Sequence, residues 1–241
     1  MRKTMNELLS EYGGGRVPLD EVQAANTMSE AEVKRALDRE RDAMRELMAT
    51  THQKAEAQAV RRLHELTLRA GVPERYSHVA LDNRHLERLE KGRGLYLCGP
   101  LGTGKTWRAC GVARGWISEH GPTARFVSTV AMLSDIRAAI SDGRGEERVT
   151  ALYARARLLV LDDIGKEPPT EWGLAKLFDV VDRRYGGMRP TVYTSQHTVS
   201  HLAEHLASRG DDLTAGAIVS RIVETTDTVS VTGADRRLRR G

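Results

Sequence analysis

The sequence has few of the residues that build disulfide frameworks and zinc sites. Only two cysteines, Cys98 and Cys110, occur among its 241 residues. Two cysteines can form neither a network of disulfides nor a four-cysteine zinc site within one chain. The composition therefore excludes small disulfide-stapled folds and is typical of a reducing compartment, which we expect to be the cytoplasm.

Long apolar runs are also absent. No stretch of 18 apolar residues occurs, and the charged N-terminus, Met1 to Glu7, lacks the apolar segment of a signal peptide. We therefore expect neither a membrane partner nor secretion.

The sequence has little excess charge of either sign. Lys and Arg number 37 and Asp and Glu number 33, which gives a net charge of +4. Residues 235–241 hold four arginines and one aspartate, so most of the excess lies in this short tail. Such a tail is either solvated or adds salt-sensitive contacts to phosphates, and the charge alone does not identify a nucleic-acid partner.

Residues 29–70 contain neither proline nor glycine and are rich in helix formers. Ser29 and Glu32 have the spacing of a capping box, while Gly71 and Pro73 predict the end of the helix. Its apolar stripe is thin and consists of Val33, Leu37, Met44 and Met48. The pattern predicts a small helical N-terminal region, residues 1–70, that docks on a partner protein.

Short apolar runs alternate with helical patterns after residue 75. This alternation predicts an α/β fold with a parallel sheet covered by helices on both faces, within a second domain at 71–241. The five predicted strands are 95–98, 125–128, 158–161, 191–194 and 228–231. The main predicted helices are 105–119, 130–140, 146–155, 171–185 and 213–223.

A phosphate-binding loop joins the first predicted strand to the helix after it. Its glycines allow backbone N–H groups to surround an anion, and the following helix presents its positive dipole end. The loop consists of Gly99, Pro100, Leu101, Gly102, Thr103, Gly104, Lys105 and Thr106. Lys105 is predicted to reach the β- and γ-phosphates of ATP, and the Thr106 hydroxyl to bind Mg²⁺.

Two adjacent carboxylates, Asp162 and Asp163, follow the third predicted strand. Ligands bind at the carboxyl ends of parallel strands, so these groups are expected beside the loop. Asp162 is predicted to hold Mg²⁺ and Asp163 to polarise the attacking water. A turn or a helix cap is the alternative role for such a pair.

The next strand ends in Thr194, Ser195 and Gln196 at the same edge of the sheet. The Gln196 amide is a candidate for holding the water or sensing the γ-phosphate. An ordinary turn at the end of a strand explains these residues equally well.

Taken together, these motifs resemble the AAA+ ATPases, and among them the helicase-loader clade typified by DnaC and DnaI, with the transposition ATPase IstB as a close relative. The similarity covers 70–237 and includes Gly71 to Tyr76, the loop, Leu159 to Gly165, Arg183 to Tyr185, Pro190 to Ser195 and Ser220 to Ile222.

The resemblance implies roles for single residues. Asp163 stands at the position of the catalytic carboxylate, and Gln196 at the sensor-1 position, where the clade usually has asparagine. Arg221 resembles the arginine finger that completes the ATP site of a neighbouring subunit. Arg236 or Arg237 corresponds to a late arginine that contacts phosphate, and the sequence does not choose between them.

The helices predicted at 130–140 and 146–155 resemble the additional helix with which this clade tracks single-stranded DNA. Ser128, Thr129, Arg137 and Arg144 are the candidates for contacting its phosphates. No aromatic residue lies among them, so base stacking is not predicted. A solvated helix surface is the alternative.

Three histidines recur at four-residue spacing, His197, His201 and His205, and His201 to His205 has the pattern of an inverted zinc-protease motif. The remaining 36 residues offer no separate helix for the further carboxylate ligand. We therefore expect a solvated helix face and no zinc.

The resemblance implies an ATPase that loads a replicative, DnaB-type helicase onto single-stranded DNA during replication initiation, working as a homo-oligomeric spiral or ring. An IstB-like ATPase that recruits a transposase is the first alternative. A non-hydrolysing adaptor is the second, and the intact Lys105, Asp162 and Asp163 argue against it.

Overall fold

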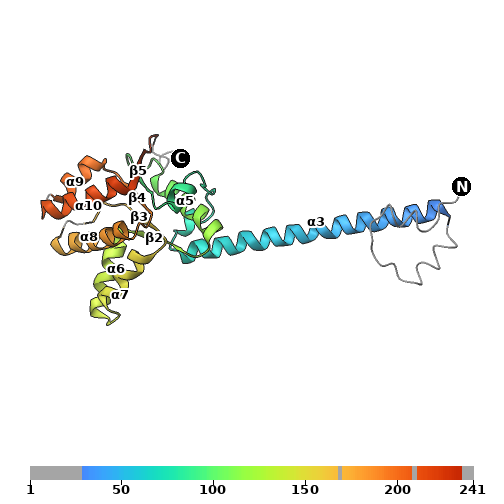
Figure 1. The fold of residues 1–241 in the computed structure, drawn as a ribbon, viewed down its shortest axis with the longest axis horizontal. Helices are drawn as coiled ribbons and strands as arrows, with labels where there is room; N and C mark the ends of the chain where they lie inside the picture. Colours follow the sequence, from blue (N-terminus) through green and yellow to red (C-terminus); the bar gives the residue numbers. More distant parts are fainter. Residues whose placement is uncertain (1–28, 168–169, 208–210, 235–241) are drawn as a thin grey trace. The chain divides into compact units, whose positions relative to one another are not determined.

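A computed structural model describes residues 29–167, 170–207 and 211–234 (Figure 1). The predicted phosphate contact by Arg236 or Arg237 lies outside the described residues. The chain divides into two compact units, Met1–Gln58 and Ala59–Gly241. None of the described helices combines the length and the apolarity needed to cross a bilayer.

The predicted N-terminal helix is present as α3, Glu30–Arg69. At its start, the backbone N–H and the hydroxyl of Ser29 both donate to the Glu32 carboxylate, at 2.8 and 2.7 Å. These bonds lower the pKa of Glu32 and form one half of the predicted capping box. At its end, Gly71 adopts a φ of +94°, and its N–H donates to the Leu68 carbonyl.

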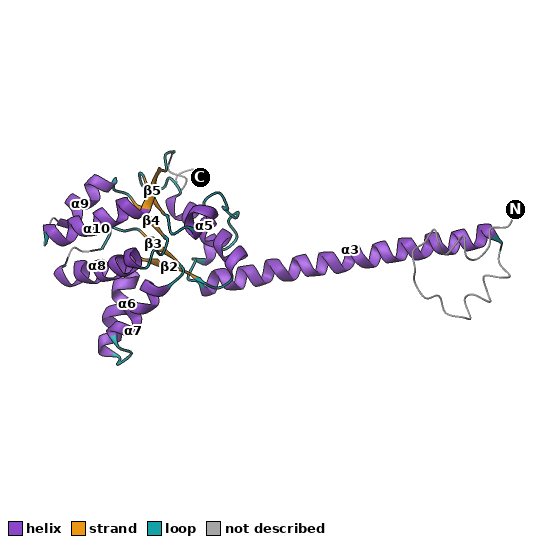
Figure 2. Cartoon of the chain, in the orientation of Figure 1, coloured by secondary structure: helices purple, strands orange, loops and turns teal. Residues whose placement is uncertain are grey.

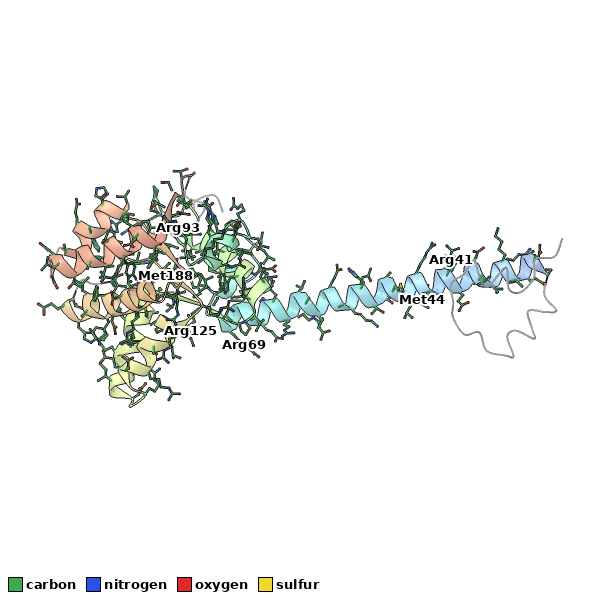
Figure 3. The ribbon with its side chains drawn as sticks, in the orientation of Figure 1. Arg41, Met44, Arg69, Arg93, Arg125 and Met188 are labelled. Atoms are coloured by element: carbon green, nitrogen blue, oxygen red, sulfur yellow. The ribbon has the colours of Figure 1, made fainter. Side chains whose placement is uncertain are left out.

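In the first unit, the side chains of α3 are largely exposed. Figure 3 shows Arg41 and Met44 on this part of the helix. Met44, Leu47 and Met48 are 50%, 61% and 65% exposed. The rest of this helix surface is charged, and its few apolar side chains are exposed. Among the described residues, this segment therefore has no core of its own.

The second unit contains the predicted five-stranded sheet, and all of its strands are parallel. The strands are β1 (Gly94–Cys98), β2 (Ala124–Ser128), β3 (Leu158–Asp162), β4 (Thr191–Ser195) and β5 (Thr226–Ser230). They lie in the order β2-β3-β4-β1-β5. Each matches a predicted strand, with starts that differ by no more than two residues, so the sheet is confirmed.

Helices connect successive strands (Figure 2). They are α5 (Lys105–His120), α6 (Thr129–Ser141), α7 (Glu146–Arg155), α8 (Glu171–Gly186), α9 (Val199–Ala207) and α10 (Asp212–Thr225). A 3-10 turn, η1 (Glu74–Tyr76), and the short helix α4 (Leu86–Glu90) precede the sheet, and the sequence patterns did not predict either.

Side-chain alternation along the strands divides the core between two faces of the sheet. Leu95 and Leu97 pack with α5, α4 and the end of α3. Tyr96 and Cys98 pack on the other face with α6 to α10. This arrangement is the predicted three-layer α/β sandwich.

The strand order determines which loops meet. β4 lies between β1 and β3, with Cys98 beside Ser195 and Leu161 beside Tyr193. The carboxyl ends of three neighbouring strands therefore bring the phosphate-binding loop, Thr194 and Asp162 to one edge of the sheet.

Candidate nucleotide-binding site

The phosphate-binding loop runs from β1 into α5 as predicted. Gly104 is the residue before the helix and has a φ of +98°, a conformation that glycine adopts at no steric cost. At Gly99, a Cβ atom would lie 2.2 Å from the Val231 carbonyl oxygen. Both positions therefore require glycine, one for its backbone angle and the other for a close approach.

Lys105 is only 6% exposed and points back along the loop. Its ammonium group donates to the carbonyls of Gly99 and Pro100, both at 2.7 Å. These carbonyls hold the cation at the centre of the loop, where phosphate oxygens are its natural partners.

The first of the two predicted acidic residues, Asp162, lies in a chain of hydroxyl contacts. Thr106 donates to one of its carboxylate oxygens at 3.0 Å, and Thr194 donates to the same oxygen at 2.7 Å. Burial raises the pKa of Asp162, and the bonds from Thr194 and Thr106 oppose that rise. Lys105 is the nearby cation that also favours the charged carboxylate.

This set of oxygens fits Mg²⁺. A buried carboxylate beside a threonine hydroxyl supplies the hard oxygen ligands that Mg²⁺ prefers, and ATP phosphates and water complete its coordination in such sites. Thr106 and Asp162 are the two residues that would hold the ion. Within the described residues, no group of three or more His, Cys, Asp and Glu side chains is placed to bind a metal.

Asp163 differs from Asp162 in both backbone and exposure. Its φ of +58° is uncommon for a residue other than glycine, and its N–H donates to the Thr194 hydroxyl at 2.9 Å. Its side chain is 35% exposed and pairs with Lys166 at 3.2 Å. The left-handed backbone at Asp163, held by the buried Thr194, thus directs the Asp162 carboxylate inward and the Asp163 carboxylate toward solvent.

Two side chains at this edge, Thr194 and Glu167, were not among the predicted site residues. Thr194 is fully buried and contacts both aspartates. Glu167 is 5% exposed and accepts the Gly165 N–H at 3.0 Å, and burial raises its pKa. Thr194 belongs to the polar cluster that ends β4, whereas the sequence around Glu167 contains no pattern that indicates its burial.

Gln196 follows β4 and is exposed. Its side-chain nitrogen lies 3.3 Å from the His197 ring nitrogen Nε2. His197 and His205 stack with ring centroids 4.7 Å apart. The sensor role of Gln196 stays a prediction.

Arg221 lies on α10 and is bound within its own subunit. Its guanidinium donates to Asp182 at 2.7 Å and to the Ala217 carbonyl at 3.1 Å, and it lies over the rings of Phe178 and Tyr185. None of these contacts of Arg221 is with the phosphate-binding loop. An arginine held in this way has to leave Asp182 in order to reach a neighbouring subunit.

The two hydroxyls predicted to contact DNA have internal partners. The Ser128 hydroxyl caps α6 by accepting the Ala131 N–H at 3.2 Å. Thr129 is fully buried, with its hydroxyl 3.4 Å from the Asp162 carbonyl. Thr129 therefore faces the interior, and a phosphate contact through it does not fit this burial.

The two arginines predicted to contact DNA are also engaged. Arg137 stacks on Trp172, with its guanidinium 4.4 Å from the ring centroid. Arg144 pairs with Asp142 at 2.7 Å and with Asp135 at 3.0 Å. The charge of Arg144 is thus compensated within the hairpin that α6 and α7 form.

The sequence also matches a family of known proteins that bind ATP. The sequence model of the family described as IstB-like ATP binding protein matches residues 20–241. The chain belongs to this family. It is therefore a member of an ATP-binding family.

Several relatives of this IstB-like chain have names that point to DNA transactions. The insertion sequence ATP-binding protein y4pL of Sinorhizobium fredii is 31% identical over 143 residues, which are 59% of this chain and 56% of y4pL. The replicative helicase loader DnaI of Bacillus subtilis is 26% identical over 167 residues, which are 67% of this chain and 53% of DnaI. The alignments thus span little more than half of either relative.

The solved structure of the DnaC helicase loader has the same fold. It superposes with a TM-score of 0.54 at 22% identity, over 66% of this chain and all of that one. This similarity confirms the predicted α/β fold, a five-stranded parallel sheet between helices, for the IstB-like chain.

Proposed function

We propose that this chain is a Mg²⁺-dependent ATPase that hydrolyses ATP to ADP and phosphate. The observation that carries the proposal is the continuous set of contacts from Thr106 through Asp162 to Thr194, beside the buried Lys105. Such a set is built to bind a nucleoside triphosphate with its metal ion and to place a carboxylate next to it.

Each residue has a chemical task in this proposal. Lys105 exchanges its carbonyl partners for the β- and γ-phosphates. Thr106 and Asp162 hold Mg²⁺, which neutralises charge on the phosphates when it is bound. Asp163, exposed at the rim, polarises the attacking water, and the amide of Gln196 orients it.

We further propose that the site is completed between copies of the chain in a homo-oligomeric spiral or ring. Arg221 then leaves Asp182 and reaches the γ-phosphate bound by a neighbour, where its charge stabilises the transition state. Until then the guanidinium lies over the rings of Phe178 and Tyr185 on α8.

Mixing two inactive variants tests this role. Arg221→Ala should lower ATP turnover by about a thousandfold, because an arginine finger contributes roughly that much. Mixing it with Lys105→Ala should restore part of the rate, since one variant supplies an intact loop and the other an intact arginine. The rate of ATP hydrolysis, measured by phosphate release at constant total protein, is the readout.

The mixture of Lys105→Ala with wild-type protein is the matched control for subunit exchange. Normal turnover by Arg221→Ala alone would show that Arg221 has no catalytic part. Failure of the mixture to exceed either variant, when exchange is demonstrated, would contradict action between subunits.

The DNA function that we propose first is the loading of a DnaB-type replicative helicase onto single-stranded DNA. It is supported by the similarity to DnaI and by the fold shared with DnaC. In this function the N-terminal region, residues 1–70, holds the helicase, and the exposed Met44, Leu47 and Met48 provide apolar contacts.

A second candidate function is the regulation of transposition through recruitment of a transposase. The family match over residues 20–241 and the similarity to y4pL favour it. The two functions share the ATPase and differ in the partner and in the form of DNA.

A transfer assay distinguishes them. The full chain with ATP is incubated with a DnaB-type helicase or with the transposase of an insertion sequence, in the presence of closed single-stranded or duplex circles. Helicase loading predicts that helicase becomes retained on single-stranded circles with the wild-type chain and not with Lys105→Ala. Retention of transposase on duplex, without transfer of helicase, would support transposition and contradict loading.

A further inference from the structure

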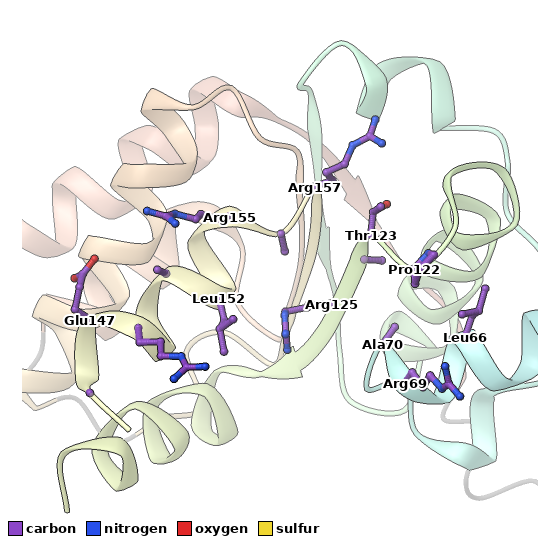
Figure 4. A pocket seen from close by; sticks show the side chains of 15 residues that line it. Leu66, Arg69, Ala70, Pro122, Thr123, Arg125, Glu147, Leu152, Arg155 and Arg157 are labelled. Carbon is purple, nitrogen blue, oxygen red and sulfur yellow. The ribbon is translucent and has the colours of Figure 1, made fainter. Parts of the chain in front are cut away.

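An arginine-lined groove lies away from the nucleotide-binding site. Its volume is about 940 Å³, and it is bounded by the end of α3, the start of β2 and one side of α7. In Figure 4, Leu152 of α7 lies on one side of Arg125 of β2, and Arg69 and Ala70 lie on the other.

The groove is at the opposite edge of the sheet from the phosphate-binding loop. Ala124 and Arg125 begin β2, and Pro122 and Thr123 come just before it. Arg157 directly precedes β3, so these residues mark the amino ends of the strands. The loop, Asp162 and Thr194 are at the carboxyl ends. A ligand in the groove therefore does not occupy the ATP site.

The charge of the groove is strongly one-sided. It is lined by one glutamate, Glu147, and by five exposed arginines, Arg69, Arg125, Arg148, Arg155 and Arg157. Glu147 forms a 2.5 Å ion pair with Arg183, which lies outside the lining. In the described part of the chain, no carboxylate lies within ion-pair distance of any of the five guanidiniums.

Aromatic rings engage two of these arginines only loosely. Arg125 lies 5.9 Å from the centroid of Tyr153, and Arg157 lies 5.9 Å from that of Trp116. Such contacts orient a guanidinium but leave its charge uncompensated. The groove thus holds an excess of positive charge that a polyanion would neutralise.

The surface between the arginines favours a phosphate backbone over an acidic peptide. The outer edge of β2 is already occupied, because the Phe126 N–H donates to the Ala70 carbonyl at 2.7 Å. An extended peptide therefore cannot add to β2 as a further strand there. The remaining lining consists largely of alanines with Leu66 and Leu152 and contains no aromatic side chain, which suits backbone contact without base stacking.

We propose that this groove binds the phosphodiester backbone of a single nucleic-acid strand. Guanidiniums match phosphate oxygens in a planar, bidentate geometry. Ligand pockets of about 300–1,000 Å³ take molecules of drug size, so this groove accommodates a few nucleotides of one strand and not the body of a duplex. None of Ser128, Thr129, Arg137 and Arg144 lines it.

Charge reversal in the full chain tests the proposal with a fluorescent oligo-dT probe. Arg125→Glu with Arg155→Glu should weaken binding by about tenfold or more at moderate salt. The slope of log Kd against log salt should fall by about 1.4, because each phosphate contact with a single strand contributes about 0.7. Binding is read by fluorescence anisotropy without hydrolysis or partner proteins, so the result does not depend on the function proposed above.

The matched control is Arg35→Glu with Arg39→Glu, which reverses two exposed arginines that do not line the groove. It should bind as the wild type does, and the groove variant should keep the basal, DNA-free ATPase rate. If the reversal variant does not fold, Arg125→Gln with Arg155→Gln replaces it, and Arg125→Lys with Arg155→Lys should retain most of the affinity.

Three results would overturn the proposal. The first is an affinity of the reversal variant within twofold of the wild type. The second is displacement of the oligonucleotide by poly-glutamate at an equal charge concentration, which would make the groove a site for acidic protein. The third is that a duplex of the same length binds the wild type as tightly as the oligonucleotide does and loses as much affinity in the reversal variant. That result would contradict a single-strand site.

Discussion

Replacing Lys105 with alanine should lower the rate of ATP hydrolysis by about a hundredfold or more. The ammonium group is buried at the centre of the loop, held by two carbonyls at 2.7 Å. Removing one hydrogen-bond donor that stabilises the charge of the transition state lowers kcat by about 10² to 10³. No other described lysine lies in the loop to replace it. Phosphate release at saturating ATP measures the loss, and binding of a fluorescent ATP analogue measures the weaker affinity.

Lys91→Ala is the matched control, because Lys91 is an exposed lysine that directly follows α4 and pairs with Glu87. It should hydrolyse ATP at the wild-type rate. The loop variant should remain folded, since the substitution removes a buried charge together with its desolvation cost. Full turnover by Lys105→Ala would show that ATP is bound elsewhere.

Replacing Arg184 with methionine should destabilise the protein by about 3 kcal/mol or more, because several buried acceptors lose their donor and each one left unsatisfied costs about 1–3 kcal/mol. Arg184 is 1% exposed, and burial lowers its pKa to about 10, so it remains charged at neutral pH. It donates to the Thr191 hydroxyl and to the backbone carbonyls of Tyr153, Ala154, Ala156 and Pro190. Methionine fills part of the volume and leaves these acceptors unpaired.

Arg183 provides the control on the same helix. Its side chain is 37% exposed and pairs with Asp179 and Glu147 at the surface. Because exposed ion pairs contribute about 0–1 kcal/mol, Arg183→Met should change the free energy of unfolding by no more than that. Urea denaturation without nucleotide measures both variants, and equal losses would contradict the structural role of Arg184.

The nucleotide-binding loop and the alternation of strands and helices were predictable because both are local patterns. Glycine spacing, a strand before the loop and a helix after it indicate a phosphate site without any knowledge of distant residues. Two-residue and 3.6-residue periodicity likewise reports which face of each element is buried. The predicted strands, the predicted helices and the end of α3 before Gly71 follow from such patterns.

The partners of individual side chains were not predictable. Thr194 contacts Asp162 across 32 residues of sequence only because β4 lies between β1 and β3. Ser128 and Thr129 were predicted to contact DNA as exposed hydroxyls, yet one caps α6 and the other is buried. The sequence also places Arg144 near acidic residues without showing that two of them pair with it.

Arg183 and Arg184 mark the boundary between what sequence and structure determine. By itself, the sequence determines the fold class and the residues of the phosphate-binding loop, because neighbours in the chain fix them. It shows two adjacent arginines and cannot tell which of them is buried. Tertiary structure alone decides that Arg184 enters the interior, because burial requires partners for its N–H groups. These partners are carbonyls of α7, about 30 residues earlier in the chain, and of the segment before β4. Tertiary structure also decides that five arginines, from α3, β2, α7 and the segment before β3, share one groove, since only packing brings together segments so far apart in sequence.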